Sequence, residues 1–449
     1  MNQLQLFLPC AAGVEEYLLP EVQHITGLGG QAVQKRRGGV ALNGAWRDVM
    51  LLNLHSRLAQ RVLVLLSYTE YRTEQDLYRA ASEVAWEAWF TPRQSIKVEV
   101  TAQHSPLTSL NFAALKVKDA VCDRFRVKAN GVRPDVDTQW PDVRIFAHLT
   151  TDGCSLYIDT SGEPLFKRGW REDKGEAPLK ETLAAAMLAA SGWLAGEGDL
   201  PPLYDPCCGS GTIAIEAAQM ACNMAAGSGR RFAFEHYLPF ARHVWDAIKK
   251  EAKDAEVARV PGQKPIIFGS DVAFRMVDFA QRNAERAGVA HALVLRGGDA
   301  LQRMPPCEGA GVMLLNPPYG ERIEVAGVAG AATRRGSNAV AQATAHDWDT
   351  DSEAPARQDQ SRSDAGAREQ AQVSDGGDFF SQLASHWKKN YTGWSAWVLT
   401  PDLKLPGRMR LKESRRVPMW NGPIECRLFR FDMSAGSMRR VAKSDPPAS

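Results

Sequence analysis

The chain has 449 residues, of which 44% are hydrophobic and 24% charged, and its formal net charge is +2, values that suit a globular protein of two or three domains. No stretch approaches the roughly 20 consecutive apolar residues of a membrane span, and the N-terminus lacks the basic start of a signal peptide. The eight cysteines are scattered, without a CxxC pair or metal-ligand spacing. The sequence therefore predicts a cytoplasmic protein with reduced thiols and no metal site.

Residues 1–160 have the pattern of a mixed helix and strand module. The segment IKVEV at 96–100 alternates as a strand does, and residues 111–126 predict a helix on which Phe112, Leu115 and Val121 stand near helical spacing. Residues 145–162 read as two strands joined through an Asp152-Gly153 turn. This mixture predicts an α+β module that is separate from the rest of the chain.

From about residue 178 to 325 the pattern changes to apolar strands that alternate with helices. A helix over PLKETLAAAMLAASGW precedes the strand before DPCCGSGT, and further strands are predicted near 265–271, 292–300 and 311–315. Such alternation is typical of βαβ units and a mostly parallel sheet with helices on both faces.

The last part of the chain contains a low-complexity stretch and a basic region. Residues 326–377 nearly lack bulky apolar side chains, so we expect a disordered insert there. Order is expected to resume at 378 and to end near 435, before a flexible tail at 436–449. From His386 onward there are 13 Lys and Arg against 5 Asp and Glu, whereas residues 1–160 carry 17 of each kind. A local basic excess suits phosphate binding, although it is also typical of a solvated tail.

The segment DPCCGSGT at 205–212 lies between a predicted strand and a predicted helix. Gly209, Ser210 and Gly211 let the backbone turn sharply and approach a ligand, and the free amides at the helix start can meet an anionic group. The segment does not have the GxGxxG spacing of a dinucleotide-binding loop, and it lacks the Lys of a P-loop. It indicates a ligand loop, with a simple strand-to-helix turn as the alternative.

Two acidic residues end the next two predicted strands. Asp271 follows PIIFGS, where a carboxylate can accept both hydroxyls of a ribose, and Asp299 follows ALVLRGG. In an open parallel sheet, ligands bind beyond the carboxyl ends of the strands, so the glycine loop and both acids are predicted to share one edge. Either acid alone would be typical of a helix cap.

The segment NPPYG at 316–320 follows the apolar strand VMLL and therefore belongs to the same edge. Pro317 and Pro318 stiffen the backbone and leave the carbonyl of Pro317 able to accept a hydrogen bond. The Asn316 side chain offers a second acceptor, so that the pair can hold both hydrogens of a planar amine. Tyr319 can stack on a flat base. The alternative is a proline-rich turn.

Together these motifs resemble class I S-adenosylmethionine (SAM)-dependent methyltransferases that methylate amines. The resemblance implies a Rossmann-like domain in which Asp271 binds ribose, Asp299 contacts adenine and the NPPY segment is catalytic. It implies that SAM is held by residues of the loop and of the strand ends: Asp205, Cys207, Gly209, Gly211, Asp271, Asp299 and Asn316. The implied catalytic residues are Asn316, Pro317, Pro318 and Tyr319.

The segments KRGWRED at 167–173, APLKETLAAAML at 177–188 and WNGPIECRLFRF at 420–431 narrow the resemblance to bacterial THUMP-containing 23S ribosomal RNA guanine 2-amino methyltransferases. The resemblance implies a ferredoxin-like part at 1–55, an RNA-binding THUMP domain at 56–162, and a methyltransferase domain made of 163–325 and 378–435. It implies a large-subunit ribosomal RNA or an assembly intermediate as partner, with no membrane and no obligate protein partner. Candidate phosphate contacts are Lys116, Lys118, Arg124 and Arg126. A second methyltransferase domain, present in some members, is not expected here.

Three other interpretations remain open. NPPY presents the same acceptors to any base amine, so a DNA adenine methyltransferase is possible on the motif alone, although such an enzyme normally needs its own target-recognition domain. Guanine methylation of transfer RNA is the second. The third is an RNA-binding assembly factor that has lost its catalytic activity.

Overall fold

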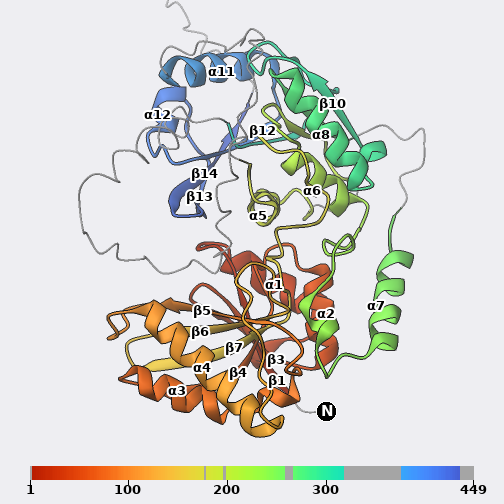
Figure 1. The fold of residues 1–449 in the computed structure, drawn as a ribbon. Helices are drawn as coiled ribbons and strands as arrows, with labels where there is room; N and C mark the ends of the chain where they lie inside the picture. Colours follow the sequence, from red (N-terminus) through yellow and green to blue (C-terminus); the bar gives the residue numbers. More distant parts are fainter. Residues whose placement is uncertain (1–2, 176–177, 196–198, 258–265, 318–375, 435–449) are drawn as a thin grey trace, which may run out of the picture.

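The computed structural model describes residues 3–175, 178–195, 199–257, 266–317 and 376–434. Figure 1 shows an N-terminal body, drawn in red to yellow, and a second body drawn in green to blue, and each is built on a seven-stranded sheet. The expected insert and tail lie outside the described residues, except that Gly376 and Gly377 open helix α11. Within the described ranges no helix is long and apolar enough to cross a bilayer.

The N-terminal sheet has the strand order β2-β3-β1-β4-β7-β6-β5. Its strands are β1 (Leu4–Pro9), β2 (Val33–Arg36), β3 (Gly39–Gly44), β4 (Leu63–Glu70), β5 (Ile96–Ala102), β6 (Val143–Leu149) and β7 (Gly153–Asp159). The helices of this body are α1 (Glu15–Thr26), α2 (Trp46–His55), α3 (Glu74–Glu83) and α4 (Leu110–Lys128). The predicted strand at 96–100 and the hairpin through Asp152-Gly153 are both confirmed.

This sheet is continuous across the expected border between residues 1–55 and 56–162. Strand β1 pairs with β4, with Leu6 opposite Val64, so both parts contribute to one sheet. Leu6, Val64 and Ile158 share one face because their strands pair at these positions, and all three belong to the main hydrophobic core. That core also contains Leu18 of α1 and Val117 of α4, so burial of one face fixes the register of the strands.

Helix α4 forms as predicted, but its buried face differs from the one that the spacing suggested. Ser109 caps the helix by accepting the backbone N–H of Phe112 at 3.2 Å. Phe112 and Leu115 are 46% and 52% exposed, whereas Ala113 and Val117 are fully buried. Of Phe112, Leu115 and Val121, which stand near helical spacing, only Val121 is therefore part of the buried face. Small side chains such as Ala113 let α4 pack closely against α3 and β5, which leaves the bulkier neighbours outside.

The second sheet has the order β10-β9-β8-β11-β12-β14-β13. Its strands are β8 (Leu203–Asp205), β9 (Ile267–Asp271), β10 (Leu293–Gly297), β11 (Val312–Leu315), β12 (Ser395–Thr400), β13 (Arg415–Asn421) and β14 (Ile424–Asp432). The helices of this part of the chain are α5 (Glu181–Ser191), α6 (Thr212–Ala221), α7 (Arg242–Asp254), α8 (Phe274–Arg286), α11 (Gly376–Asn390) and α12 (Leu405–Met409). Of these, α7 lies beside α2 of the N-terminal body (Figure 1). Strands β10, β9, β8, β11 and β12 run parallel to one another. Strand β14 is antiparallel to β12, and β13 is antiparallel to β14.

Helices cover both faces of this sheet, which confirms the predicted Rossmann-like class. Leu314 of β11 packs into the main core with Ile213 of α6, whereas its neighbour Met313 packs into a second core with Trp387 of α11. The chain runs from β8 outward to β9 and β10, then returns to β11 on the other side of β8. The carboxyl ends of β8 and β11 therefore flank a topological switch point, which is where ligands bind in such sheets.

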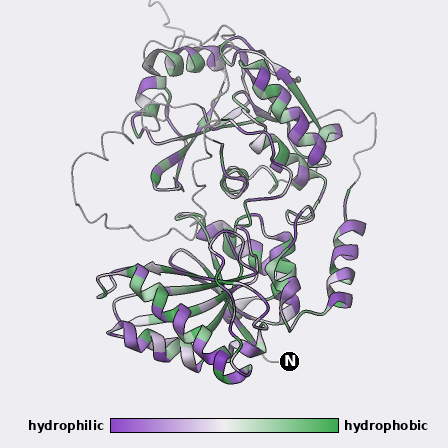
Figure 2. Cartoon of the chain, in the orientation of Figure 1, coloured by the Kyte–Doolittle hydropathy of each residue, from purple (hydrophilic) through white to green (hydrophobic). Residues whose placement is uncertain are grey.

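Figure 2 places hydrophobic residues along the strands and hydrophilic ones on outward helix faces. Helix α7 is the clearest case, because it is mostly hydrophilic and buries Trp245 and Ile248. Both cluster with residues of the main core, so even this peripheral helix is held by an apolar stripe.

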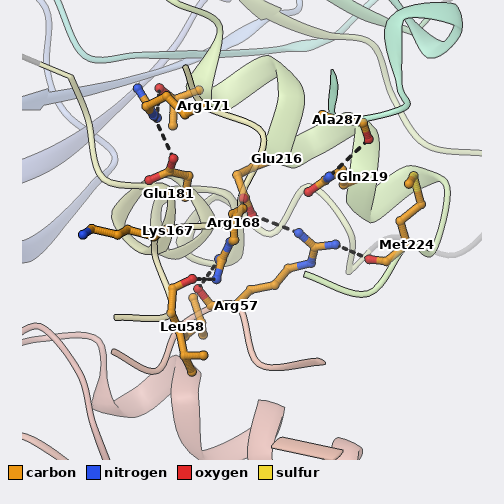
Figure 3. A network of polar contacts seen from close by, with 12 residues as sticks. Arg57, Leu58, Lys167, Arg168, Arg171, Glu181, Glu216, Gln219, Met224 and Ala287 are labelled. Carbon is orange, nitrogen blue, oxygen red and sulfur yellow. Dashed lines mark hydrogen bonds and ion pairs between the residues drawn. The ribbon is translucent and has the colours of Figure 1, made fainter. Parts of the chain in front are cut away.

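The two bodies are joined by a buried polar network centred on Glu216 of α6 (Figure 3). Arg57, which follows α2, donates from Nη1 to Glu216 Oε2 at 2.9 Å, and Arg168 donates from Nε to Oε1 at 3.0 Å. Arg168 also donates to the backbone oxygens of Arg57 at 2.8 Å and Leu165 at 2.6 Å. Burial alone would raise the pKa of Glu216, but the two arginines outweigh it and lower that pKa.

Candidate active site

The glycine loop leaves β8 at Asp205 and enters α6 at Thr212. Gly211 has φ +90°, and a Cβ there would lie 2.9 Å from Cβ of Ala280, so glycine is required for α8 to pack against the loop. Gly209 has φ +51°, and a Cβ there would meet Met276 Cε at 3.9 Å. Among the described residues a side chain at Gly209 would thus meet only Met276, at an ordinary van der Waals distance, whereas the position at Gly211 is filled by protein.

Asp271, at the end of β9, holds the glycine loop in place. Its Oδ2 accepts the backbone N–H of Gly209 at 2.9 Å and its Oδ1 accepts that of Ala273 at 2.9 Å. Burial raises the pKa of Asp271, and these two bonds partly oppose the rise. An ionised carboxylate accepts about four hydrogen bonds, so each oxygen retains capacity for a ligand hydroxyl.

Asp205 is 2% exposed, and its Oδ1 accepts the backbone N–H of Cys207 at 3.1 Å. Burial, with a smaller effect of nearby Asp271, raises the pKa of Asp205 well above its usual range. The Cys207 side chain is half-buried, and burial raises the pKa of its thiol well above its usual range. A raised thiol pKa disfavours the thiolate form that a nucleophilic cysteine requires.

Asp299 lies in the turn after β10 and accepts the backbone N–H of Leu301 at 2.9 Å through Oδ1. The turn is tied to β9, because the amide of Gly298 donates to the backbone oxygen of Asp271 at 2.9 Å. The predicted convergence of Gly209, Asp271 and the β10 end on one edge is therefore observed.

Asn316 and Pro317 follow directly on β11. Strand β11 pairs in parallel with β8, with Met313 opposite Tyr204, so Asn316 emerges at the same edge as the glycine loop. Asn316 is half-buried and Pro317 is buried. Pro318 and Tyr319 lie outside the described residues. The described half of the NPPY segment is thus placed at the switch point, beside the loop.

Three features at this edge were not predicted from the sequence. Arg171 donates to Glu181 Oε1 at 2.7 Å (Figure 3). It also donates to Thr212 Oγ1 at 2.8 Å and to Ser210 Oγ at 3.2 Å, so it braces the glycine loop from the inter-body linker. Buried Asn283 of α8 donates to the backbone oxygen of Ser210 at 3.1 Å. Neither contact has a local sequence signal, because each partner is far away in the chain.

The third feature is a pair of exposed apolar side chains beside Asp271. Val272 is 59% exposed and Phe274 is 74% exposed. The Phe274 ring lies against Gly297 at the end of β10, where an added Cβ would come within 2.3 Å of it. The sequence signal that could have identified this apolar surface is the position of Val272 and Phe274 directly after Asp271, the acidic residue that ends β9.

The four basic candidates on α4 differ in their surroundings. Arg124 is held by both carboxylate oxygens of Glu87 at 2.7 Å and by the backbone oxygen of Ser82 at 2.8 Å. Lys118 pairs with Asp119 at 2.5 Å, and Arg126 pairs with Asp123 at 2.7 Å while remaining exposed. Lys116 lies over the Phe112 ring at 5.3 Å.

Comparison with known families matches this architecture segment by segment. The RlmL ferredoxin-like domain matches residues 5–63, the THUMP domain matches 71–159, and the RMKL-like methyltransferase domain matches 168–347. The chain therefore combines a ferredoxin-like domain, a THUMP domain and an RMKL-like methyltransferase domain. Its strand order, glycine loop and NPPY segment are those of the methyltransferase part, and α3 and α4 belong to the THUMP part.

Individual relatives of this THUMP methyltransferase-fold protein cover nearly all of it. A ribosomal RNA large subunit methyltransferase K/L of Psychromonas ingrahamii is 32% identical over 96% of this chain and 50% of the relative, so the chain spans about half the length of such relatives. A solved structure from Listeria monocytogenes, named as a predicted N6-adenine-specific DNA methylase, has 26% identity and a TM-score of 0.73 over 96% of both chains. The SMU.472 protein, solved with SAH, has a TM-score of 0.74 at 24% identity over 96% of this chain and 98% of that one.

Proposed function

We propose that the chain transfers the methyl group of SAM to the 2-amino group of a guanine in 23S ribosomal RNA, in the cytoplasm. The observation that carries the proposal is the placement of Asn316 and Pro317 at the end of β11, beside the glycine loop on β8. Groups that accept the hydrogens of an amine and a loop that binds the methyl donor would lie at one switch point, so the amine and the methyl group would be held close together.

SAM fits the groups at this edge. A Cβ at Gly209 would meet only Met276 among the described residues, so a ligand backbone can approach there, and Asp271 keeps acceptor capacity for ribose hydroxyls. Val272 and Phe274 offer apolar surface to an adenine, next to the turn that carries Asp299. A metal is not required by this scheme, and no cluster of three His, Cys, Asp or Glu side chains suited to one occurs in the described parts of the chain.

The chain's own residues hold and orient the target amine. The side-chain oxygen of Asn316 and the backbone oxygen of Pro317 each accept one amine hydrogen, which turns the nitrogen lone pair toward the ligand loop. SAM supplies the electrophilic methyl group when bound. The proton leaves after attack, so a strong general base is not needed, and Tyr319 and Pro318 are proposed to cover the base.

RNA is favoured as substrate by the THUMP module and by the names of the curated relatives. On α4 we propose phosphate contacts for Lys116, Lys118 and Arg126. Arg124 is also proposed as a phosphate contact, in which its guanidinium group binds the phosphate and Glu87 together. We propose large-subunit RNA or an assembly intermediate, rather than transfer RNA or DNA, as the partner.

Nucleoside mass spectrometry of ribosomal RNA, transfer RNA and DNA from a deletion strain, with primer extension to map the RNA site, tests this proposal. We expect loss of one 2-amino-methylated guanine in 23S RNA, restored by the wild-type gene and by Asp254→Asn, an exposed control on α7, but not by Asn316→Ala. Loss of a methylated guanine from transfer RNA, or of a methylated adenine from DNA, would overturn the assignment of 23S RNA as the substrate. No loss anywhere, with RNA binding retained, would indicate the catalytically silent assembly factor.

A further inference from the structure

The basic region that begins at His386 lies largely on folded surface. Ten of its 13 Lys and Arg are in α11, α12, β13 and β14 or directly beside them. The four acidic residues among its described positions each pair with one arginine: Asp402 with Arg408, Glu413 with Arg416, Glu425 with Arg427 and Asp432 with Arg430. The other six cations are exposed and form no ion pair with the described part of the chain: Lys388, Lys389, Lys404, Arg410, Lys412 and Arg415. We call these six the basic strip.

The basic strip lies at the β13 end of the second sheet. Helix α12 packs on α11, and the chain after α12 leads directly into β13, the outermost strand (Figure 1). Lys388, near the end of α11, donates to the backbone oxygen of Arg410 at 3.0 Å, so the two segments meet there. From Arg410 to Arg415 the chain can span at most about 18 Å. Arg410, Lys412 and Arg415 therefore follow one another closely along this end of the sheet.

Arg410 occupies a backbone position that glycine usually takes. It ends α12 with φ +48° and ψ +40°, in the left-handed region, and its N–H donates to the backbone oxygen of Gly407 at 3.2 Å. A residue with a Cβ is strained in this conformation, so glycine would make the fold more stable. The exposed guanidinium group of Arg410 forms no hydrogen bond with the residues that the structure describes. The fold itself therefore gives no reason for an arginine here.

Arg415 lies directly opposite another arginine. It pairs in register with Arg430 of β14, and the two guanidinium groups lie over the Trp397 ring at 6.0 and 5.6 Å from its centroid. Like charges that are directly opposite destabilise an antiparallel pair. Asp432 accepts from Arg430 Nε at 2.8 Å, which leaves the charge of Arg415 uncompensated. Arg410 and Arg415 are thus both unfavourable for folding, which is expected of residues that serve a function.

The basic strip suits an extended polyanion that presents phosphates. Its cations are spread along α11, α12 and β13 and do not converge on one point. No aromatic side chain at the described positions 386–434 is exposed, and Trp397 is only 1% exposed, so a base finds no ring on which to stack. Lysines and arginines in such an array bind successive backbone phosphates, and the release of counterions drives the binding.

We propose that the basic strip binds the phosphate backbone of the RNA substrate, independently of the base sequence. The inference rests on the proposed function only in that RNA is taken as the substrate. It assigns an RNA contact to the methyltransferase-fold body, at the opposite end of the sheet from β10. This contact is separate from α4 of the N-terminal body and from the amine acceptors that follow β11.

Fluorescence anisotropy with two single-stranded RNA oligonucleotides of equal length, one of uridine and one of adenosine, tests the proposal. Arg410→Gly/Arg415→Gln removes two phosphate contacts, so it should weaken the binding of both oligonucleotides about tenfold at low salt and reduce the slope of log affinity against log salt by about 1.4. The same variant should have a melting temperature at least as high as wild type, because it relieves the positive φ and the like-charge pair. The matched control is Arg242→Gln/Lys250→Gln, which removes two exposed positive charges from α7.

Wild-type affinity in the strip variant would overturn the proposal, and so would an equal loss of affinity in the control, which would show non-specific attraction. A loss confined to one of the two oligonucleotides would also overturn it, because it would indicate that bases are read. A melting temperature below that of wild type would contradict the inference that these arginines are unfavourable for folding, and the proposal would fall with it.

Methyl transfer distinguishes this inference from the proposed function. With substrate RNA, the strip variant should have a KM for RNA about tenfold higher and an unchanged kcat, because remote phosphate contacts stabilise the ground state and the transition state equally. If oligonucleotide binding depends on the strip but no RNA is methylated, the proposed function fails and this site stands. If RNA is methylated and the strip variant keeps the wild-type KM, this site fails and the proposed function stands.

Discussion

Arg57 and Glu216 are 159 positions apart in the chain, yet Arg57 Nη1 lies 2.9 Å from Glu216 Oε2 in a buried contact. Arg57 lies in the segment that matches the ferredoxin-like domain, and Glu216 lies on α6, the helix that follows the glycine loop. The pair, with Arg168, therefore fixes the methyltransferase-fold body relative to the N-terminal body (Figure 3).

Glu216→Gln should lower the free energy of unfolding by about 3–5 kcal/mol, because it leaves two buried arginines without a counter-charge. Since the folded-state pKa of Glu216 lies below the usual 4.5, its contribution is present above that pH and is lost as the pH falls through the folded-state pKa. Urea denaturation near neutral pH and again below pH 4.5 measures both effects. A variant as stable as wild type at neutral pH would show that the network does not hold the two bodies together.

Gly209→Ala and Gly211→Ala should separate ligand binding from folding. Both residues have positive φ, which costs about 1–2 kcal/mol for alanine. Only Gly211→Ala also meets Ala280 at 2.9 Å, so it should lower the melting temperature more. Gly209→Ala places a methyl group at an ordinary contact distance of 3.9 Å from Met276 and should mainly weaken SAM binding. Calorimetric titration with SAM and thermal unfolding distinguish them; equal effects of both variants on stability and affinity would contradict the different roles.

Arg171→Lys should weaken SAM binding about tenfold, since lysine cannot bond Thr212, Ser210 and Glu181 in one fixed plane. Affinity for RNA should not change. Arg282→Lys, which alters a partly exposed pair with Asp173 at 2.7 Å, is the matched control. If the two variants have the same SAM affinity, Arg171 does not position the loop.

Asp271→Asn should weaken SAM binding by at least about tenfold, because the amide replaces one of the two oxygens that accept from Gly209 and Ala273. The exposed carboxylate of Asp278, on the same helix that Asp271 precedes, gives the control Asp278→Asn. Isothermal titration with SAM provides the measurement. Wild-type affinity in Asp271→Asn would remove Asp271 from the proposed ribose contact.

The sequence was sufficient to predict the edge on which the candidate site lies. Asp205, Asp271 and Asn316 each end an apolar strand, and parallel strands bring their ends together whatever the intervening loops do. The order of the motifs along the chain was therefore enough to predict that they meet at one edge of the sheet. The β13–β14 hairpin was not predicted, although Asn421-Gly422 supplied the turn signal.

Contacts between distant segments could not be predicted in the same way. Nothing near Arg171 or Arg57 in the sequence identifies Thr212 or Glu216 as a partner, because these pairs exist only once the two bodies have packed. On α4, helical spacing favoured the large Phe112 and Leu115, whereas close packing selected Ala113 and Val117.

Asn316 is proposed to hold a base amine for methyl transfer. This role is tested most directly by measuring the transfer of labelled methyl groups from SAM to unmodified 23S RNA, with wild type and Asn316→Ala at matched SAM occupancy. We predict 2-amino-methylated guanine with wild type and a rate at least about 100-fold lower with Asn316→Ala at unchanged SAM affinity. Equal rates, or loss of SAM binding in step with loss of transfer, would contradict the account.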